Sequence, residues 1–346
     1  MPLTITKPDD WHVHLRDGAI LAAVAPATAR CFGRAIVMPN LDPPVTTVAA
    51  ALAYRGRILA AVGDARAFEP LMTLYLTDRT TPDTIHAASA AGIAAVKMYP
   101  AGATTHSASG VTNPLALDGV YRALSETGLP LLVHGEVTDH EVDIFDREAV
   151  FLDRVLEPIR SRYPDLRLVL EHVTTAEGVE FVRSAGTRTA ATVTAHHLLL
   201  NRNALFAGGL RPHHYCLPVL KRERHRQALL DAVLGGHERF FLGTDSAPHA
   251  RGEKESACGC AGVYTAPAAI ELYAELFAQH EALDRLEGFA SRFGPAFYGR
   301  PENRGLLELV EREWIVPEAV DAGGETIIPF RAGARIGWQV VEEAAS

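Results

Sequence analysis

The chain has 346 residues, of which 48% are hydrophobic and 22% are charged, and its formal net charge is −9. This composition is typical of a globular protein with a large buried core. The negative charge argues against a broad surface for nucleic acid or anionic membrane, although a local arginine can still hold a small anion. No apolar run reaches the roughly 18–20 residues needed to cross a bilayer. Four cysteines do not make a disulfide framework and the N-terminus does not read as a signal peptide, so we expect a cytoplasmic protein.

Eight short apolar runs, rich in branched residues, alternate with alanine-rich helical segments. This alternation is typical of a parallel sheet covered on both faces. Eight such units in about 240 residues predict an α/β fold, a (β/α)₈ TIM barrel. An open doubly wound sheet is the alternative, but no Gly-x-Gly-x-x-Gly follows the first strand. The expected strands are, in chain order, residues 11–14, 34–40, 71–77, 94–99, 129–134, 166–172, 189–194 and 239–245.

The chain beyond the last expected strand is predicted to stay attached to the barrel. Residues 266–297 predict helices, and residues 301–346 predict a short C-terminal extension packed on a barrel core of residues 8–300. Only eleven residues precede His12, which leaves no room for an N-terminal β-sandwich domain. We therefore expect a single domain over residues 1–346.

The first expected strand leads into the most informative run of the chain, Asp9–Asp17. Alternate side chains of an extended backbone point to the same face, so His12, His14 and Arg16 can converge on one point. Two imidazoles are metal ligands, and a guanidinium is a permanent cation for an anion. The ordinary alternatives are a hydrogen-bonded core histidine and a surface ion pair between Arg16 and Asp17.

Further polar residues stand at the downstream ends of the other expected strands. In a barrel these ends meet at one rim, where active sites are built. Imidazole nitrogens and a carboxylate form a ligand set that Zn²⁺ accepts. The residues that the sequence places on this rim are His12, His14, Asn40, Lys97, His134, His172 and Asp245.

Lys97 is unusual because it closes a buried apolar strand, where an ammonium group carries a heavy desolvation cost. An ion pair with Asp or Glu is the default explanation. Alternatively, burial near two cations would lower the pKa of Lys97 from about 10.4 and leave a neutral amine. A neutral amine can react with CO₂ to form a carbamate, whose two oxygens can bridge two metals.

Nine runs of residues match the pattern of one known family in the order in which they occur. They are Asp10-Trp11-His12-Val13-His14-Leu15-Arg16-Asp17, Met38-Pro39-Asn40-Leu41, Lys97-Met98-Tyr99-Pro100-Ala101, Val133-His134-Gly135-Glu136, Glu171-His172, Arg211-Pro212, Cys216-Leu217-Pro218, Gly243-Thr244-Asp245-Ser246-Ala247-Pro248-His249 and Cys258-Gly259-Cys260-Ala261-Gly262. With these runs the chain resembles the short, bacterial (class II) dihydroorotases of the amidohydrolase superfamily.

The resemblance implies a site with two Zn²⁺ ions. The implied ligands are His12, His14 and Asp245 for one ion, His134 and His172 for the other, and N6-carboxylated Lys97 as the bridge between them. Metal coordination lowers the pKa of water enough to supply hydroxide near neutral pH. Asp245 would take the proton of this nucleophile and return it to the departing nitrogen.

The resemblance also implies a small anionic substrate, dihydroorotate or N-carbamoyl-L-aspartate. A guanidinium offers a forked pair of donors for its carboxylate. A small, polar loop around Thr104 and Thr105 is a lid candidate, with an ordinary surface loop as the alternative. Asn40 is alternatively a turn residue after Pro39. The implied substrate-binding residues are Arg16, Asn40, Leu217, His249, Ala261, Thr104 and Thr105.

The implied reaction is the reversible cyclisation of N-carbamoyl-L-aspartate to (S)-dihydroorotate with release of water, a step of pyrimidine biosynthesis. One alternative is a related cyclic amidase (hydantoinase, dihydropyrimidinase or allantoinase), whose substrates lack the carboxylate and leave Arg16 without a partner. A non-catalytic scaffold is a second alternative, disfavoured because all six ligand side chains are present. The resemblance suggests a homodimer, and we expect no nucleic-acid or membrane partner.

Overall fold

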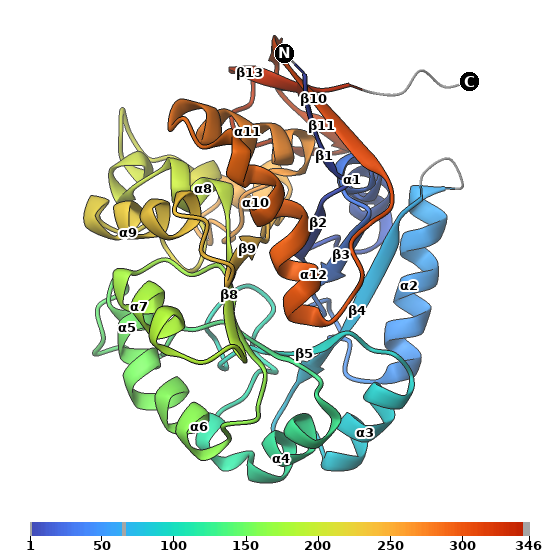
Figure 1. Ribbon diagram of the computed structural model, residues 1–346, viewed down its shortest axis with the longest axis vertical. Coiled ribbons are helices and arrows are strands. Elements are labelled where there is room, and N and C mark those ends of the chain that lie inside the picture. Colours follow the sequence, from blue (N-terminus) through green and yellow to red (C-terminus); the bar gives the residue numbers. More distant parts are fainter. Residues whose placement is uncertain (1, 64–66, 342–346) are drawn as a thin grey trace.

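The computed structural model describes residues 2–63 and 67–341. Eight parallel strands form one sheet in sequential order, and helices surround it (Figure 1). A parallel bridge between Val13 and Ser246 connects the first strand to the segment after the last strand and closes the barrel. The strands are β2 (Asp9–Val13), β3 (Arg34–Val37), β4 (Glu69–Leu76), β5 (Ala95–Met98), β6 (Leu131–Val133), β7 (Leu168–Leu170), β8 (Thr189–Val193) and β9 (Phe240–Leu242). The predicted TIM barrel is confirmed. Most strands are shorter than the apolar runs from which they were predicted, whereas β2 and β4 begin two residues earlier than predicted.

Helices follow the strands and bury their apolar faces against the outside of the barrel. Several begin after a threonine whose hydroxyl accepts a hydrogen bond from the backbone N–H three residues later, as Thr47, Thr81 and Thr175 do. The helices are α1 (Gly18–Cys31), α2 (Val48–Val62), α3 (Pro82–Ala90), α4 (Asp118–Thr127), α5 (Arg147–Phe151), α6 (Glu157–Arg162), α7 (Ala176–Ser184), α8 (Ala195–Leu199), α9 (Glu223–Leu234), α10 (Arg251–Lys254), α11 (Ala269–Gln279) and α12 (Phe293–Tyr298). Within the described residues, no helix is long and apolar enough to cross a membrane.

The inside of the barrel has its own apolar core at the end where the strands begin. Trp11 of β2 and Phe241 of β9 lie there, and Tyr298 of α12 stacks on Trp11 with ring centroids 4.4 Å apart. Gly294 lets α12 approach this closely, because a Cβ at that position would lie 1.9 Å from the indole nitrogen of Trp11. The N-terminal end of the barrel is therefore filled, and any pocket has to form at the other end.

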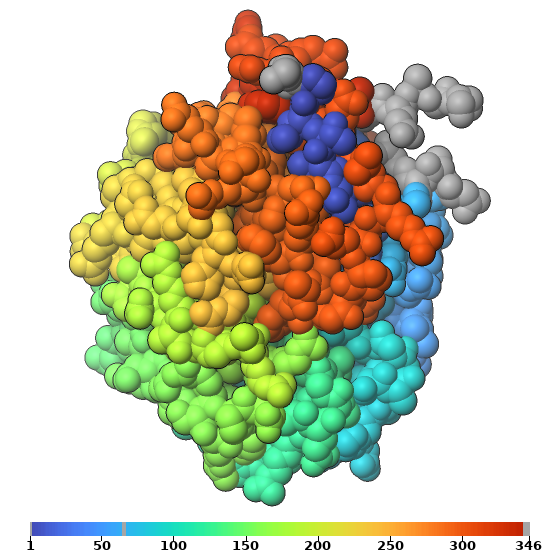
Figure 2. All heavy atoms as spheres, viewed as in Figure 1, coloured from blue at the N-terminus to red at the C-terminus, as the bar shows by residue number. Residues whose placement is uncertain are grey.

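The C-terminal extension forms a small sheet together with the start of the chain. β10 (Leu306–Ile315) lies between β1 (Leu3–Thr6) and β13 (Arg335–Val340), and β11 (Val320–Ala322) pairs with β12 (Glu325–Ile327). In Figure 2 the N-terminal segment lies among the C-terminal segments on the surface of the barrel. β1 was not predicted from the sequence. That residues 1–346 form a single domain stays a prediction.

Candidate metal and substrate site

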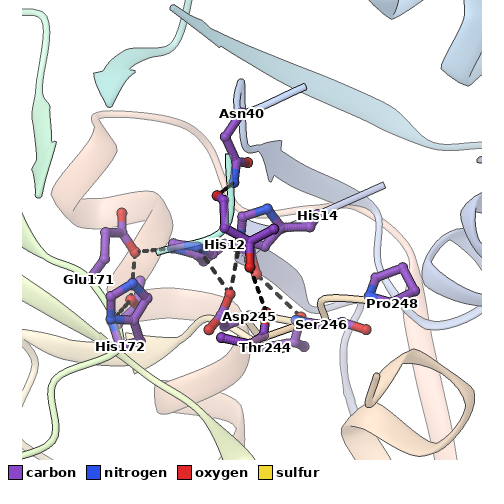
Figure 3. Close-up of polar contacts among 12 residues, drawn as sticks. His12, His14, Asn40, Glu171, His172, Thr244, Asp245, Ser246 and Pro248 are labelled. Atoms are coloured by element: carbon purple, nitrogen blue, oxygen red, sulfur yellow. Dashed lines mark hydrogen bonds and ion pairs between the residues drawn. The ribbon is translucent and has the colours of Figure 1, made fainter. Parts of the chain in front are cut away.

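The two strands that meet at the closure of the barrel carry the first group of predicted ligands (Figure 3). His12 lies in β2, His14 follows β2 directly, and Asp245 follows β9. The backbone N–H of Asp245 donates to the carbonyl of His12 at 2.8 Å, and that of His14 donates to the carbonyl of Ser246 at 3.0 Å. These bonds hold the three side chains at one corner of the rim.

His12, His14 and Asp245 form a compact donor set, with one possible ligand atom of each within 4.8 Å of the others. Asp245 Oδ1 lies 3.4 Å from His12 Nε2 and 3.0 Å from His14 Nε2. Burial alone would raise the pKa of Asp245, but the hydrogen bond from His14 and the surrounding imidazoles hold it well below its usual range. The carboxylate is therefore ionised, as a metal ligand has to be.

A buried carboxylate fixes the orientation of His12. His12 Nδ1 donates to Glu171 Oε2 at 2.6 Å, and the same oxygen accepts a 2.6 Å hydrogen bond from the hydroxyl of Thr192. Because Nδ1 carries the proton, Nε2 keeps its lone pair and points toward Asp245. Glu171 belongs to the Glu171-His172 motif, but no role was predicted for it from the sequence.

His134 and His172 form the second group, with ring centroids 4.8 Å apart. His134 Nε2 lies 2.9 Å from Glu136 Oε2, which leaves its Nδ1 as the possible ligand atom. Burial lowers the pKa of both histidines, so the imidazoles are neutral lone-pair donors. The ring of His172 lies 5.0 Å from that of His12, so the two groups adjoin each other.

Lys97 lies in β5, where its side chain is fully buried. Its Nζ has no hydrogen-bond partner and no ion-pair partner among the described residues, so the default explanation of an ion pair is wrong. The ammonium group lies 5.0 Å from the ring centroid of Tyr99. Burial lowers the pKa of Lys97 to about 8, although the charges of Glu171 and Asp245 act against this shift.

The donor atoms of these residues fit divalent metal ions. His12 Nε2, Lys97 Nζ and His172 Nδ1 are all buried without a hydrogen-bond partner, which is costly for a polar atom unless something else satisfies it. His172 and Asp245 also adopt left-handed backbone conformations, with φ of 41° and 44°. Such strain in non-glycine residues is concentrated at functional sites, where it aims side chains.

Arg16 lies on the same rim, with a φ of 57° and a partly buried guanidinium. Its Nε donates to the carbonyl of Pro248 at 3.1 Å. No described carboxylate lies within ion-pair distance of Arg16, and Asp17 pairs instead with Arg57 at 2.7 Å. The surface ion pair considered from the sequence is therefore wrong, and the forked donors face the pocket.

The loop of Thr104 and Thr105 covers the pocket. Asn40 Nδ2 donates to the carbonyl of Thr105 at 3.3 Å, and Thr105 Oγ1 lies 3.5 Å from the carbonyl of Ala261. The arrangement is that of a loop closed over a pocket. The residues that line this pocket are His14, Arg16, Asn40, Tyr99, Thr104, Thr105, His134, His172, Leu217, Asp245, Ala247, Ala261 and Gly262.

Three predicted site residues lie behind the pocket surface. His12 and Lys97 are buried among the ligands, and His249 supports the wall. His249 Nε2 lies 2.9 Å from Arg16 Nη2 and 3.1 Å from the carbonyl of Ala261. Since one nitrogen of a neutral imidazole cannot both accept from the guanidinium and donate to the carbonyl, His249 makes one of these contacts at a time.

Comparison with known proteins agrees with this geometry. The model of the amidohydrolase family matches residues 5–309. A dihydroorotase of Cupriavidus pinatubonensis is 62% identical over 338 residues, which cover 97% of this chain and 98% of the relative. The chain belongs to the dihydroorotases of the amidohydrolase family. The dihydroorotase of Campylobacter jejuni superposes with a TM-score of 0.91 at 34% identity, covering 99% of this chain and 98% of the other.

A second dihydroorotase structure shows what a member of the family can bind. The enzyme of Saccharomyces cerevisiae, solved in complex with 5-fluoroorotic acid, is 34% identical and has a TM-score of 0.90. The match covers 98% of each chain.

Proposed function

We propose that the chain interconverts N-carbamoyl-L-aspartate and (S)-dihydroorotate, the dihydroorotase step of pyrimidine biosynthesis, and that Arg16 binds the substrate carboxylate. The observation that carries the substrate assignment is the guanidinium of Arg16, which is partly buried beside His14 in the pocket wall without a described acid partner. A carboxylate is the anion that matches the forked donors of such a cation.

Two divalent metal ions, which we propose to be zinc, complete the site. His12, His14 and Asp245 would hold one ion, and His134 and His172 would hold the other. The bound ions would lower the pKa of water and polarise the amide carbonyl. The nitrogen donors favour zinc over harder cations such as Mg²⁺.

Lys97 would bridge the two ions as a carbamate. Its neutral amine attacks CO₂, a proton leaves, and the charged product carries two oxygens. The amine is buried, unpartnered and close to both ligand groups. A lysine that stayed unmodified would leave an ammonium group among metal ligands, which repels the cations it has to face.

The protein side chains supply the proton transfer and the orientation. Asp245 accepts the proton of the attacking water and returns it to the nitrogen that leaves during ring opening. Arg16, Asn40 and the loop of Thr104 and Thr105 hold the ring in place and exclude water. Ring opening creates a second carboxylate and releases a proton, so alkaline pH favours N-carbamoyl-L-aspartate and acidic pH favours closure.

The test uses dihydroorotate and dihydrouracil, which differ by the carboxylate. We expect turnover of dihydroorotate with little turnover of dihydrouracil, and Arg16→Ala to raise KM for dihydroorotate by about 30- to 100-fold, as for a lost charged hydrogen bond. Arg57→Ala is the matched control, because this neighbouring arginine is exposed and pairs with Asp17. Comparable turnover of both rings, unaffected by Arg16→Ala, would mean a different cyclic amidase.

Metal analysis of the purified protein tests the cofactor and separates an enzyme from a scaffold. We expect about two zinc ions per chain and a carbamate adduct on Lys97 by crystallography. Absence of zinc, together with absence of activity after addition of zinc and bicarbonate, would support a non-catalytic scaffold. The cytoplasmic location and the homodimer stay predictions, and size-exclusion chromatography with light scattering tests the latter.

A further inference from the structure

Lys254, the last residue of α10, is a second buried lysine near the pocket, with 3% of its surface exposed. Its Nζ donates to three backbone carbonyls, those of Tyr215 at 2.9 Å, Cys260 at 2.7 Å and Gly262 at 2.8 Å. These carbonyls belong to the two loops that carry Leu217 and Ala261. The two loops are 45 residues apart in sequence (215 against 260), and Lys254 joins them.

The three carbonyls match the three N–H donors of an ammonium group. No acid lies within ion-pair distance of Lys254 in the described parts of the chain, so backbone dipoles and the ring of Tyr215, 5.7 Å from Nζ, stabilise its charge. Burial lowers the pKa of Lys254 to about 8, which shows that the position is costly for a cation. A fully hydrogen-bonded cation in such a position needs a reason beyond packing.

The geometry of the peptide bond connects this contact to the pocket. The carbonyl of Cys260 and the N–H of Ala261 belong to the same peptide unit, which is trans. In a planar trans peptide these two groups point in opposite directions. Because Lys254 holds the carbonyl on one side, the N–H of Ala261 is directed to the other side, and Ala261 lines the pocket.

The N–H of Ala261 is available to a ligand. None of the described residues accepts a hydrogen bond from it, whereas the next N–H, that of Gly262, donates to the carbonyl of Tyr215 at 3.0 Å. The carbonyl of Ala261 already contacts His249 at 3.1 Å. The donor therefore lies close to the residues around Arg16 that we assign to the anionic substrate.

We propose that Lys254 is a positioning residue for substrate binding, whose ammonium group sets the Cys260–Ala261 peptide so that the N–H of Ala261 donates to a substrate oxygen. The proposal rests on the proposed function, because it concerns the same pocket. Lys254 does not touch substrate. It acts through the backbone of the two loops whose carbonyls it holds.

The first experiment is steady-state kinetics of the zinc-loaded protein on dihydroorotate with Lys254→Met, which keeps the length of the side chain and removes its charge and donors. We expect KM to rise about five- to tenfold, the value of one hydrogen bond, with kcat changed less than about twofold. Lys254→Gln keeps an N–H₂ group that can donate to some of the three carbonyls. The KM of this variant should therefore lie between those of the wild-type protein and Lys254→Met. This variant also serves if Lys254→Met does not fold.

Chemical rescue separates a positioning role from a merely structural one. Lys254→Ala leaves a cavity that a small primary alkylammonium ion can occupy while donating to the three carbonyls. We expect methylammonium or ethylammonium to lower the KM of Lys254→Ala toward the wild-type value, and tetramethylammonium, a cation without N–H donors, to have no effect. Rescue by both kinds of cation would overturn the proposal in favour of simple charge or cavity filling.

Lys221 offers a matched control, because it is also buried (4% exposed) and donates to one carbonyl, that of Val219, at 2.9 Å. We expect Lys221→Met to lower thermal stability while leaving KM unchanged. Wild-type protein that does not turn over dihydroorotate would overturn the proposed function. Active wild-type protein with an unchanged KM in Lys254→Met and Lys254→Gln would overturn only the role of Lys254.

Discussion

The two walls of the pocket are built in different ways. On the metal side, side chains at strand ends provide the possible ligand atoms. Buried carboxylates orient them, as Glu171 Oε2 does for His12 Nδ1 at 2.6 Å. On the other wall, the loops around Leu217 and Ala261 line the pocket, and Lys254 and His249 contact the backbone carbonyls of the Ala261 loop. The comparison teaches that changes on the metal side should reduce kcat or metal content, whereas changes behind the loop wall should raise KM.

The largest effect should come from Asp245→Asn. Asn cannot take the proton of the nucleophile, so we expect kcat to fall by about 10³-fold or more, with a folded protein by circular dichroism. Metal content measured on the same sample separates loss of proton transfer from loss of a ligand. An Asp245→Asn variant with near wild-type kcat would remove this residue from the reaction and break the assignment of the metal side.

A smaller effect is expected from Glu171→Gln, which keeps the shape of the side chain and removes the charge that holds His12 Nδ1. Losing such a partner of a ligating histidine costs about 10- to 100-fold in metal affinity or activity. Competition with a zinc chelator measures the affinity. Glu177→Gln is the control, because Glu177 is half exposed and only approaches His225 at 3.4 Å. Equal zinc affinity in both variants would contradict the orienting role.

These two sides also differ in how far the sequence could predict them. Period-two spacing put His12 and His14 on one face, and strand ends put them on one rim with Asp245, because strand order converts directly into position on the rim. The grouping of these three residues around one ion came from the resemblance to the family. The role of Glu171 was missed, although its place directly before His172 in β-strand context was a signal. The hydrogen bond from Lys254 to the carbonyl of Cys260 could not be predicted, because it depends on the path of the loops in three dimensions, which no local sequence pattern encodes.

The barrel followed from periodicity, whereas β1 and the strands of the C-terminal extension were not predicted. Residues 3–6 pair with residues 306–309 of β10. A stretch this short has no clear periodicity of its own, and its partner is far away in the sequence, so no local pattern predicts the pairing. Most of the barrel strands, although not β2 and β4, were predicted too long for a similar reason. Apolar residues continue past the last ladder hydrogen bond into the rim, where tertiary contacts and not sheet pairing bury them.

Gly262→Ala tests the loop wall with a moderate effect. A Cβ at this position would lie 2.6 Å from the carbonyl oxygen of Ala247, and the φ of 155° is rare for a residue with a side chain. We expect the wall to shift, with KM raised several-fold, stability lowered by about 1–3 kcal/mol and zinc content unchanged. Gly252→Ala is the control, because a Cβ there meets nothing within 4 Å. A loss of zinc in Gly262→Ala with unchanged KM would break the division between the two walls.

The smallest effect is expected from Asp17→Asn, which changes the acid next to Arg16 in sequence. Asp17 pairs with Arg57 at 2.7 Å, both side chains are nearly half exposed, and such pairs contribute about 0–1 kcal/mol. Asn can also still cap α1, where Asp17 accepts a hydrogen bond from the N–H of Gly18. Thermal unfolding should therefore change little, and KM for dihydroorotate should equal the wild-type value. A lower KM in Asp17→Asn would show that this acid competes with the substrate carboxylate for Arg16 in solution, and the guanidinium would then not be free as the structure has it.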